Sequence, residues 1–340
     1  MRARRPIKKR ELDWDDHWLL IRLPRRVGQR LFKDQPIPHD RRLDLGRPGS
    51  CIPAPKLAEV LAACLFHRAD EIFASRSSAV MPIKIQITAL SKGGLAQHRG
   101  GTVRHDAVAW GYARAADQLG VDIIQNCEVT GFRIEGGACL GVDTSRGYIA
   151  GGKIAACVAG SSGRLMSKAG MRLPIESHVL QAFVSEGLKP IIPGVITYGA
   201  GHFYVSQSDK GGLVFGGDID GYNSYAQRGN LPVVEDVCEG GMSLMPMIGR
   251  AKLLRMWGGI MDMTPDGSPI IDKTHIEGLY LNAGWCYGGF KAVPASGHCF
   301  AYLLATDRPH SAAARFRLDR FRSGRGLMDE EGTGAQHNLH

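Results

Sequence analysis

The sequence lacks several features that would assign it to a class at once. Its eight cysteines include no C-x-x-C pair, and a chain of 340 residues needs no disulfide framework, so we expect reduced thiols. No apolar run of about 18 residues occurs, which predicts that no segment spans a membrane. The basic start of the chain is not followed by the apolar segment of a secretory signal. These absences together predict a cytoplasmic protein.

The sequence also lacks the motifs of a metal site and of a dinucleotide-binding loop. No group of His, Cys and Asp residues has the spacing of a metal site, so none is predicted. Residues 1–95 contain no G-x-G, whereas a dinucleotide-binding strand–turn–helix unit needs G-x-G-x-x-G to bring its backbone close to the pyrophosphate. The G-x-G at 199–201 has Tyr204 in place of the last glycine, so we do not assign it this role.

The net charge of +9 is distributed very unevenly along the chain. Residues 1–95 contain 19 of the 42 basic and 10 of the 33 acidic residues, whereas residues 96–340 contain 23 of each and are neutral. Glycine follows the opposite distribution, because only 5 of the 44 glycines lie in the first segment. The high pI of 9.2 is therefore no indication that the main part of the chain binds nucleic acid.

The pattern of apolar residues predicts an α/β (α+β) fold in which strands and helices mix. Residues 1–95 form a basic segment that we expect to be poorly ordered or atypical, with a helix at 55–66 and a strand at 81–90. From Gly100 onward the pattern is regular. The expected elements there are a helix at 107–118 capped by Asp106, strands at 121–125, 128–135 and 138–144, a strand pair within 148–159, strands at 178–187 and within 202–219, a helix at 233–247, a strand at 279–283, a glycine-rich turn at 284–289 and a helix at 295–306.

The strongest local signal for a binding site is the glycine-rich segment 282–297. It follows an apolar strand and leads into a helix, which can bring backbone N–H groups to an anionic ligand. Lys291 is the only Asp, Glu, Lys or Arg between Leu279 and Thr306. A lone ammonium in apolar surroundings favours a nearby anion, such as a reduced flavin ring or a substrate carboxylate. The alternative is a lysine whose stem lies on the apolar surface and whose charge reaches water.

Two motifs in the C-terminal part resemble the flavin-dependent amine oxidases of the D-amino-acid oxidase/sarcosine oxidase superfamily. They are WGGIMDMTPDGSPI at 257–270 and GWCYGGFK at 284–291. Further segments are similar to the beta subunits of heterotetrameric sarcosine oxidases, and the resemblance covers about residues 97–340. These segments are RGGTVRHDAVAWGYARAAD at 99–117, GVDIIQNCEVTG at 120–131, SHVLQAFVSE at 177–186, YVSQ at 204–207, DGYNSYAQRG at 220–229 and the tail 329–340.

The resemblance implies a two-domain flavoprotein that oxidises sarcosine. Noncovalent FAD takes the electrons, a covalent FMN receives them, and oxygen is reduced to hydrogen peroxide. Glycine is one product, and the one-carbon unit passes to tetrahydrofolate. Alpha, gamma and delta subunits complete such an enzyme, and NAD is bound by the alpha subunit.

The resemblance also implies roles for five residues. His105 matches the histidine that carries the covalent FMN, and a neutral imidazole is a reasonable nucleophile for that bond. Val129 and Gly289 match positions that contact FAD. Lys291 matches a lysine near the flavins, where it could bind the substrate carboxylate or stabilise a reduced ring. Cys286 stands where the family usually has glycine, so its side chain either crowds the flavin or points away.

The implied domains divide the chain at about residues 95, 270 and 325. Residues 96–270 are expected to form mainly the substrate domain with parts of the FAD domain, residues 271–325 the C-terminal part of the FAD domain, and residues 326–340 a tail. The first βαβ unit of the FAD domain is expected to be missing, because residues 1–95 do not match the family. We therefore expect the chain as written to bind FAD weakly or not at all.

Two alternatives remain open at this stage. The chain could be another flavin-dependent amine oxidase or dehydrogenase, of the dimethylglycine dehydrogenase or glycine oxidase type. It could also be a truncated, non-catalytic remnant that retains subunit contacts, which the missing glycine-rich loop favours. The sequence of His105 followed by Asp106, together with the matching tail, favours the sarcosine oxidase assignment.

Overall fold

The computed structural model describes residues 20–22, 101–198 and 203–323. The helix expected at 55–66, the strand expected at 81–90 and the tail 326–340 lie outside these residues. The strands are β1 (Leu20–Arg22), β2 (Asp122–Ile124), β3 (Val129–Glu135), β4 (Ala138–Thr144), β5 (Gly147–Ala150), β6 (Ile154–Ala156), β7 (Glu176–Gly187), β8 (Ile196–Tyr198), β9 (Phe203–Gln207), β10 (Gly212–Ile219), β11 (Leu253–Met263), β12 (Ile270–Lys273) and β13 (Leu279–Ala283). The helices are α2 (His105–Gln118), α3 (Ser162–Ser167), α4 (Leu231–Leu244), α5 (Gly289–Thr306) and α6 (Arg320–Ser323), with 3-10 turns η1 (Ala159–Ser161), η3 (Pro246–Arg250), η4 (Cys286–Gly288) and η5 (Ser311–Ala313).

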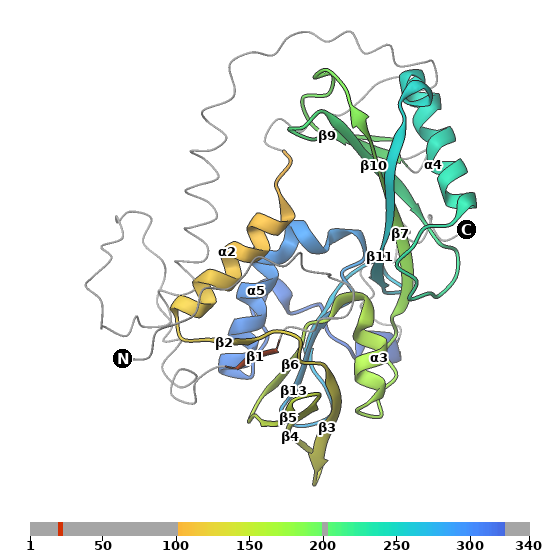
Figure 1. The fold of residues 1–340 in the computed structure, drawn as a ribbon. Coiled ribbons are helices and arrows are strands. Elements are labelled where there is room, and N and C mark those ends of the chain that lie inside the picture. Colours follow the sequence, from red (N-terminus) through yellow and green to blue (C-terminus); the bar gives the residue numbers. More distant parts are fainter. Residues whose placement is uncertain (1–19, 23–100, 199–202, 324–340) are drawn as a thin grey trace, which may run out of the picture.

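A five-stranded antiparallel sheet in the order β11-β7-β10-β9-β8 forms one half of the molecule. Helix α4 lies along one face of it (Figure 1). Successive strand residues point to opposite faces, so Phe183, Phe215 and Val205, which are cross-strand partners, all face the helix. Gly241 allows the close approach of the helix, since a Cβ there would lie 2.7 Å from the ring of Phe203.

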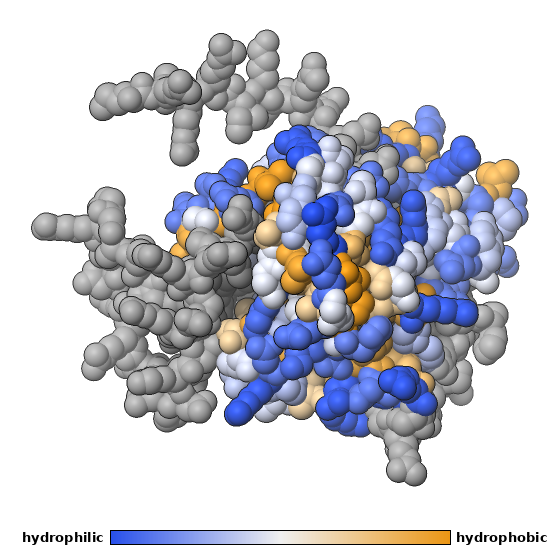
Figure 2. Space-filling model, turned by 90° about the horizontal axis from the view of Figure 1, so that it is seen from below, coloured by the Kyte–Doolittle hydropathy of each residue, from blue (hydrophilic) through white to orange (hydrophobic). Residues whose placement is uncertain are grey.

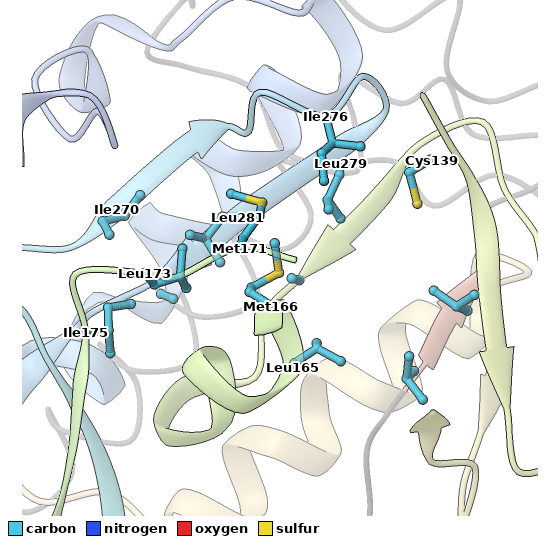
Figure 3. Packing of buried hydrophobic residues seen from close by; sticks show 14 residues of the cluster. Cys139, Leu165, Met166, Met171, Leu173, Ile175, Ile270, Ile276, Leu279 and Leu281 are labelled. Atoms are coloured by element: carbon cyan, nitrogen blue, oxygen red, sulfur yellow. The ribbon is translucent and has the colours of Figure 1, made fainter. Parts of the chain in front are cut away.

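The other half contains the mixed sheet β12-β13-β6 and the antiparallel sheet β3-β4-β5. Strand β13 is buried on both faces, and its alternating residues serve two clusters. Leu279 and Leu281 pack with Met166 of α3 in the cluster shown in Figure 3. Tyr280 points to the other face and belongs to a second cluster, together with Phe300 and Leu303 of α5. The strand is thus a layer between two sets of helices, as its nearly continuous apolar sequence requires.

The underside of this half is a solvated surface. Figure 2 shows it from below, where hydrophilic residues dominate and apolar residues occur in scattered patches. No helix in the part of the chain that the structure describes is long and apolar enough to cross a membrane.

Several expected elements are confirmed, most clearly the hairpin of β3 and β4. Its two turn residues, Gly136 and Gly137, have φ of +59° and +85°, a conformation that glycine adopts readily. The prediction that Asp106 caps α2 is wrong, because the helix begins one residue before it. The Asp106 carboxylate instead pairs with Arg104, at 2.6 Å from its Nη2.

Two further expectations need correction. Strands β5 and β6 do not pair with each other: β5 pairs with β4, and β6 pairs with the distant β13. Helix α5 begins at Gly289 rather than at 295, because Pro294 lies inside the helix instead of at its first turn. Local sequence could not reveal either fact, since both depend on packing between segments that are far apart in the chain.

Candidate functional site

The site lies at the carboxyl edge of the parallel pair β6 and β13. Leu279 is the partner of Ile154 and Leu281 the partner of Ala156, so the two strands end side by side. A short turn follows each strand, and a helix follows each turn: η1 leads to α3, and η4 leads to α5. In α/β proteins this edge is where ligands bind, because loops and helix N-termini converge there.

The first turn, after β6, is pressed against strand β11. A Cβ on Gly160 would lie 2.4 Å from the carbonyl oxygen of Ile260, so only glycine fits. Ala159 adopts a φ of +42°, which is uncommon for a residue with a side chain. The Ser162 hydroxyl donates to the Ala159 carbonyl and the Ser177 hydroxyl to the Gly160 carbonyl, each at 2.7 Å. The turn is therefore fixed from two sides.

The second turn, after β13, is held by the end of the same strand β11. Gly284 has a φ of +74°, and a Cβ there would lie 2.4 Å from the methyl group of Thr264. The Gly284 N–H donates to Oδ2 of Asp262 at 2.5 Å. Asn282 then links the turn to α5, because its Oδ1 accepts from the Trp285 ring at 2.7 Å and its Nδ2 donates to Ser296 at 2.8 Å.

The N-terminus of α5 gives this edge a positive electrostatic character. The helix has 18 residues, no acidic residue in its first turn and no side chain that caps its first N–H groups. Those N–H groups carry the positive end of the helix dipole. Lys291 adds a full charge in the same turn, so the edge favours an anion or an oxygen-rich ligand.

The structure places three of the five predicted site residues together on the second turn and the helix after it. Gly289 is the first residue of α5, and a Cβ there would lie 3.2 Å from Cβ of Trp285. Lys291 is exposed, so its charge reaches water as in the second of the two interpretations above, and its role beside a flavin stays a prediction. The early start of α5 puts Lys291 on the helix surface instead of inside the turn.

Cys286 has a side chain that turns toward β11. Its Sγ lies 3.4 Å from the Thr264 N and 3.5 Å from the Thr264 hydroxyl. Burial raises the pKa of the Cys286 thiol. Its φ of +49° is in the left-handed region, which explains why glycine suits this position.

The other two predicted residues lie on separate elements. Val129 is the buried first residue of β3, and its carbonyl accepts from Nζ of Lys168 at 2.8 Å. His105 is the exposed first residue of α2. Neither residue lies in the turn at 284–288 or in α5, so their flavin roles stay predictions.

The first turn and Asp262 were not predicted from the sequence. Residues 157–162 repeat the pattern of the second turn, an apolar strand followed by small residues and a helix, so this signal was available. Asp262 had no comparable signal, since 22 residues separate it from Gly284. No group of His, Cys, Asp and Glu in the described ranges could hold a metal ion.

The comparisons with known proteins agree with this geometry. The sequence profile of the family "FAD dependent oxidoreductase" (DAO) matches residues 38–303, a range that begins inside the segment 1–95. The chain belongs to this family, and its mixed sheets form the FAD-dependent oxidase fold. L-Proline dehydrogenase from P. horikoshii has a similar structure, with a TM-score of 0.60 and 26% identity over 64% of this chain and 60% of that one.

Within the family, the sequence is similar to curated sarcosine oxidase beta subunits. The subunit from Rhizobium meliloti (strain 1021) is 71% identical over 249 residues, which are 73% of this chain and 60% of that protein. A glycine oxidase from Pseudomonas putida is 27% identical over 191 residues, 56% of this chain and 51% of that protein. The chain thus spans about 60% of the length of its more similar curated relative.

The residues at the edge fit the FAD that the family implies. Gly160 and Gly289 keep the backbone of both turns close to their neighbours, and the N-terminus of α5 offers N–H groups to an anionic group. Cys286, which could have crowded a flavin, directs its sulfur toward Thr264 instead.

Replacing Cys286 tests whether its left-handed backbone is strained. We expect Cys286→Gly to be more stable than Cys286→Ala by about 1 kcal/mol, because alanine keeps the unfavourable φ that glycine relieves. Both variants lose the sulfur contacts with Thr264, so each is a control for the other. The measurement is the free energy of unfolding in urea. An alanine variant as stable as the glycine variant would show that the backbone there is not strained.

Proposed function

We propose that the chain acts as the beta subunit of a sarcosine oxidase and carries out the oxidative demethylation of sarcosine. The observation that carries this proposal is the identity of 71% to a subunit of that name, over 249 residues or 73% of the chain. The products are glycine, hydrogen peroxide and a one-carbon unit that tetrahydrofolate accepts. Alpha, gamma and delta subunits are the proposed partners, with NAD on the alpha subunit, in the cytoplasm.

The second turn and α5 supply the electrostatics that this reaction needs. FAD, when bound, accepts the two electrons of the amine. The protein's part is to hold the substrate carboxylate and to stabilise negative charge, which the first N–H groups of α5 and the Lys291 ammonium can do from one side. Gly289 lets the start of the helix pack close to Trp285, because a Cβ there would lie 3.2 Å from Cβ of Trp285.

His105 is the proposed attachment site of FMN. Its ring is exposed at the start of α2 and is therefore accessible to a flavin. Arg104 and Asp106 flank His105 in the sequence. The Arg104 guanidinium donates a hydrogen bond to the Asp106 carboxylate, and this bond lowers the pKa of Asp106. The carboxylate thus remains charged near the imidazole that has to act as a nucleophile.

A glycine oxidase type of activity is the second candidate. The relative from Pseudomonas putida supports it at 27% identity, so the sarcosine assignment is the stronger one. Comparing sarcosine, dimethylglycine and glycine as reductants of the bound flavin separates these activities. A chain that binds no flavin, even with partner subunits, would instead be a non-catalytic remnant.

Replacing His105 tests the covalent flavin. We expect His105→Ala, produced together with the partner subunits, to abolish flavin that remains on the protein after acid precipitation, because alanine has no nucleophilic nitrogen. His275→Ala is the matched control, since this histidine is also exposed but lies between β12 and β13. Peptide mass spectrometry is the measurement. Flavin attached to a peptide without His105 would refute the assignment.

Replacing Lys291 tests the proposed electrostatic role. We expect Lys291→Met to slow the reduction of the bound flavin by sarcosine about 100-fold, as for the loss of one charge-stabilising group. The free energy of unfolding of this variant should change little, because the Lys291 side chain is exposed. Lys273→Met, at the exposed end of β12, should leave the rate unchanged. Equal rates for both variants would remove Lys291 from the mechanism.

A further inference from the structure

Asp262 is a buried carboxylate whose hydrogen-bond partner is a backbone N–H group. It lies near the end of β11 with 3% of its surface exposed. Its Oδ2 accepts from the Gly284 N–H at 2.5 Å. Burial raises its pKa, and the backbone N–H groups nearby, first of all that of Gly284, act in the opposite direction.

The nearby Asp266 shows how different this arrangement is. Asp266 forms a bidentate ion pair with Arg320, at 2.7 Å and 3.0 Å, so its buried charge is neutralised by a cation. Among the described residues Asp262 forms no ion pair, and its carboxylate instead accepts from Gly284 at the start of the second turn. A buried carboxylate is costly, so it is retained where its acceptor role matters.

The turn that Asp262 holds has an unusual backbone. Cys286 has a left-handed φ of +49°, although it is not glycine, and Gly284 is pressed against Thr264. Such conformations persist only where the surroundings fix them from several sides. Here the surroundings are two residues of one segment: Asp262 binds the start of the turn, and Thr264 contacts the sulfur of Cys286.

We propose that Asp262 is a positioning residue for the flavin site. By accepting from Gly284 it fixes the turn 284–288 against β11, and it thereby fixes the start of α5, where Gly289 and Lys291 lie. Asp262 acts through the turn and contacts neither flavin nor substrate. The proposal depends on the proposed function only for what the turn binds, because the positioning itself follows from the hydrogen bonds.

The thiol of Cys286 provides a direct test in the full chain. Cys286 and Cys238 of α4 are both partly buried, and burial raises the pKa of both thiols. Alkylation by iodoacetamide, followed by peptide mass spectrometry, measures each rate separately. Burial and, to a smaller extent, the charge of Asp262 raise the pKa of the Cys286 thiol, so the rates are compared per thiolate, from their dependence on pH. In Asp262→Asn we expect this rate for Cys286 to rise about 10-fold or more, because the charge-assisted hydrogen bond that holds the turn is lost, while that of Cys238 is unchanged.

Asp272→Asn is the matched control. Asp272 on β12 also accepts a distant backbone N–H, from Leu318 at 2.9 Å, but that bond holds the C-terminal segment and not the turn. This variant should leave the rate of Cys286 unchanged. An unchanged rate in Asp262→Asn, or equal acceleration of both thiols, would overturn the proposal, since the second result is what general loosening produces.

Amide exchange keeps the proposal testable if Asp262→Asn fails to fold. In the wild-type chain the N–H group of Gly284 should exchange at least 10-fold more slowly than those of Tyr287 and Gly289, since a strong hydrogen bond to a buried carboxylate holds it. Equal exchange would overturn the proposal.

Added FAD distinguishes failure of this proposal from failure of the proposed function. If FAD slows alkylation of Cys286 in the wild type and slows it less in Asp262→Asn, both are supported. If Asp262→Asn accelerates alkylation but FAD protects neither protein, the positioning role is supported and a flavin at this turn is contradicted.

Discussion

The parallel pairing of β6 with β13 is the constraint on which the candidate site depends. These strands are separated by more than 120 positions in the sequence, yet Leu279 pairs with Ile154 and Leu281 with Ala156. Because the pairing is parallel, both strands end at one edge, and the turns that follow them meet there. An antiparallel arrangement would send the two turns to opposite ends of the sheet and leave no common site.

Strand β11 connects this edge to the rest of the molecule. It is the outer strand of the five-stranded sheet, and its last residues contact both turns (Figure 1). Ile260 lies against Gly160, Asp262 accepts from Gly284, and Thr264 contacts Cys286. One strand therefore fixes the relative positions of the two turns and of the sheet beside them. This explains how a site made of glycine-rich turns can be well defined without a dense set of side chains.

The predictable parts of the structure were those with local signals. The hairpin of β3 and β4 followed from its Gly136-Gly137 turn, and β13 from its apolar run before a glycine-rich segment. The partner of β6 was not predictable, because nothing near residue 154 indicates a strand at 279. Lys291 was identified from composition, but its exposure depends on where α5 begins, and Pro294 suggested a later start. Asp262 could not be found, since its role arises only when β11 and the turn come together.

Amide exchange in the presence of FAD tests most directly whether the carboxyl edge of β6 and β13 is the flavin site. The chain should be compared with and without FAD at concentrations high enough to compensate for weak binding. We predict slower exchange in both turns, residues 157–162 and 284–291, with little change in the five-stranded sheet away from β11. Protection of only one turn, or protection elsewhere, would contradict the claim that the two turns form one flavin site.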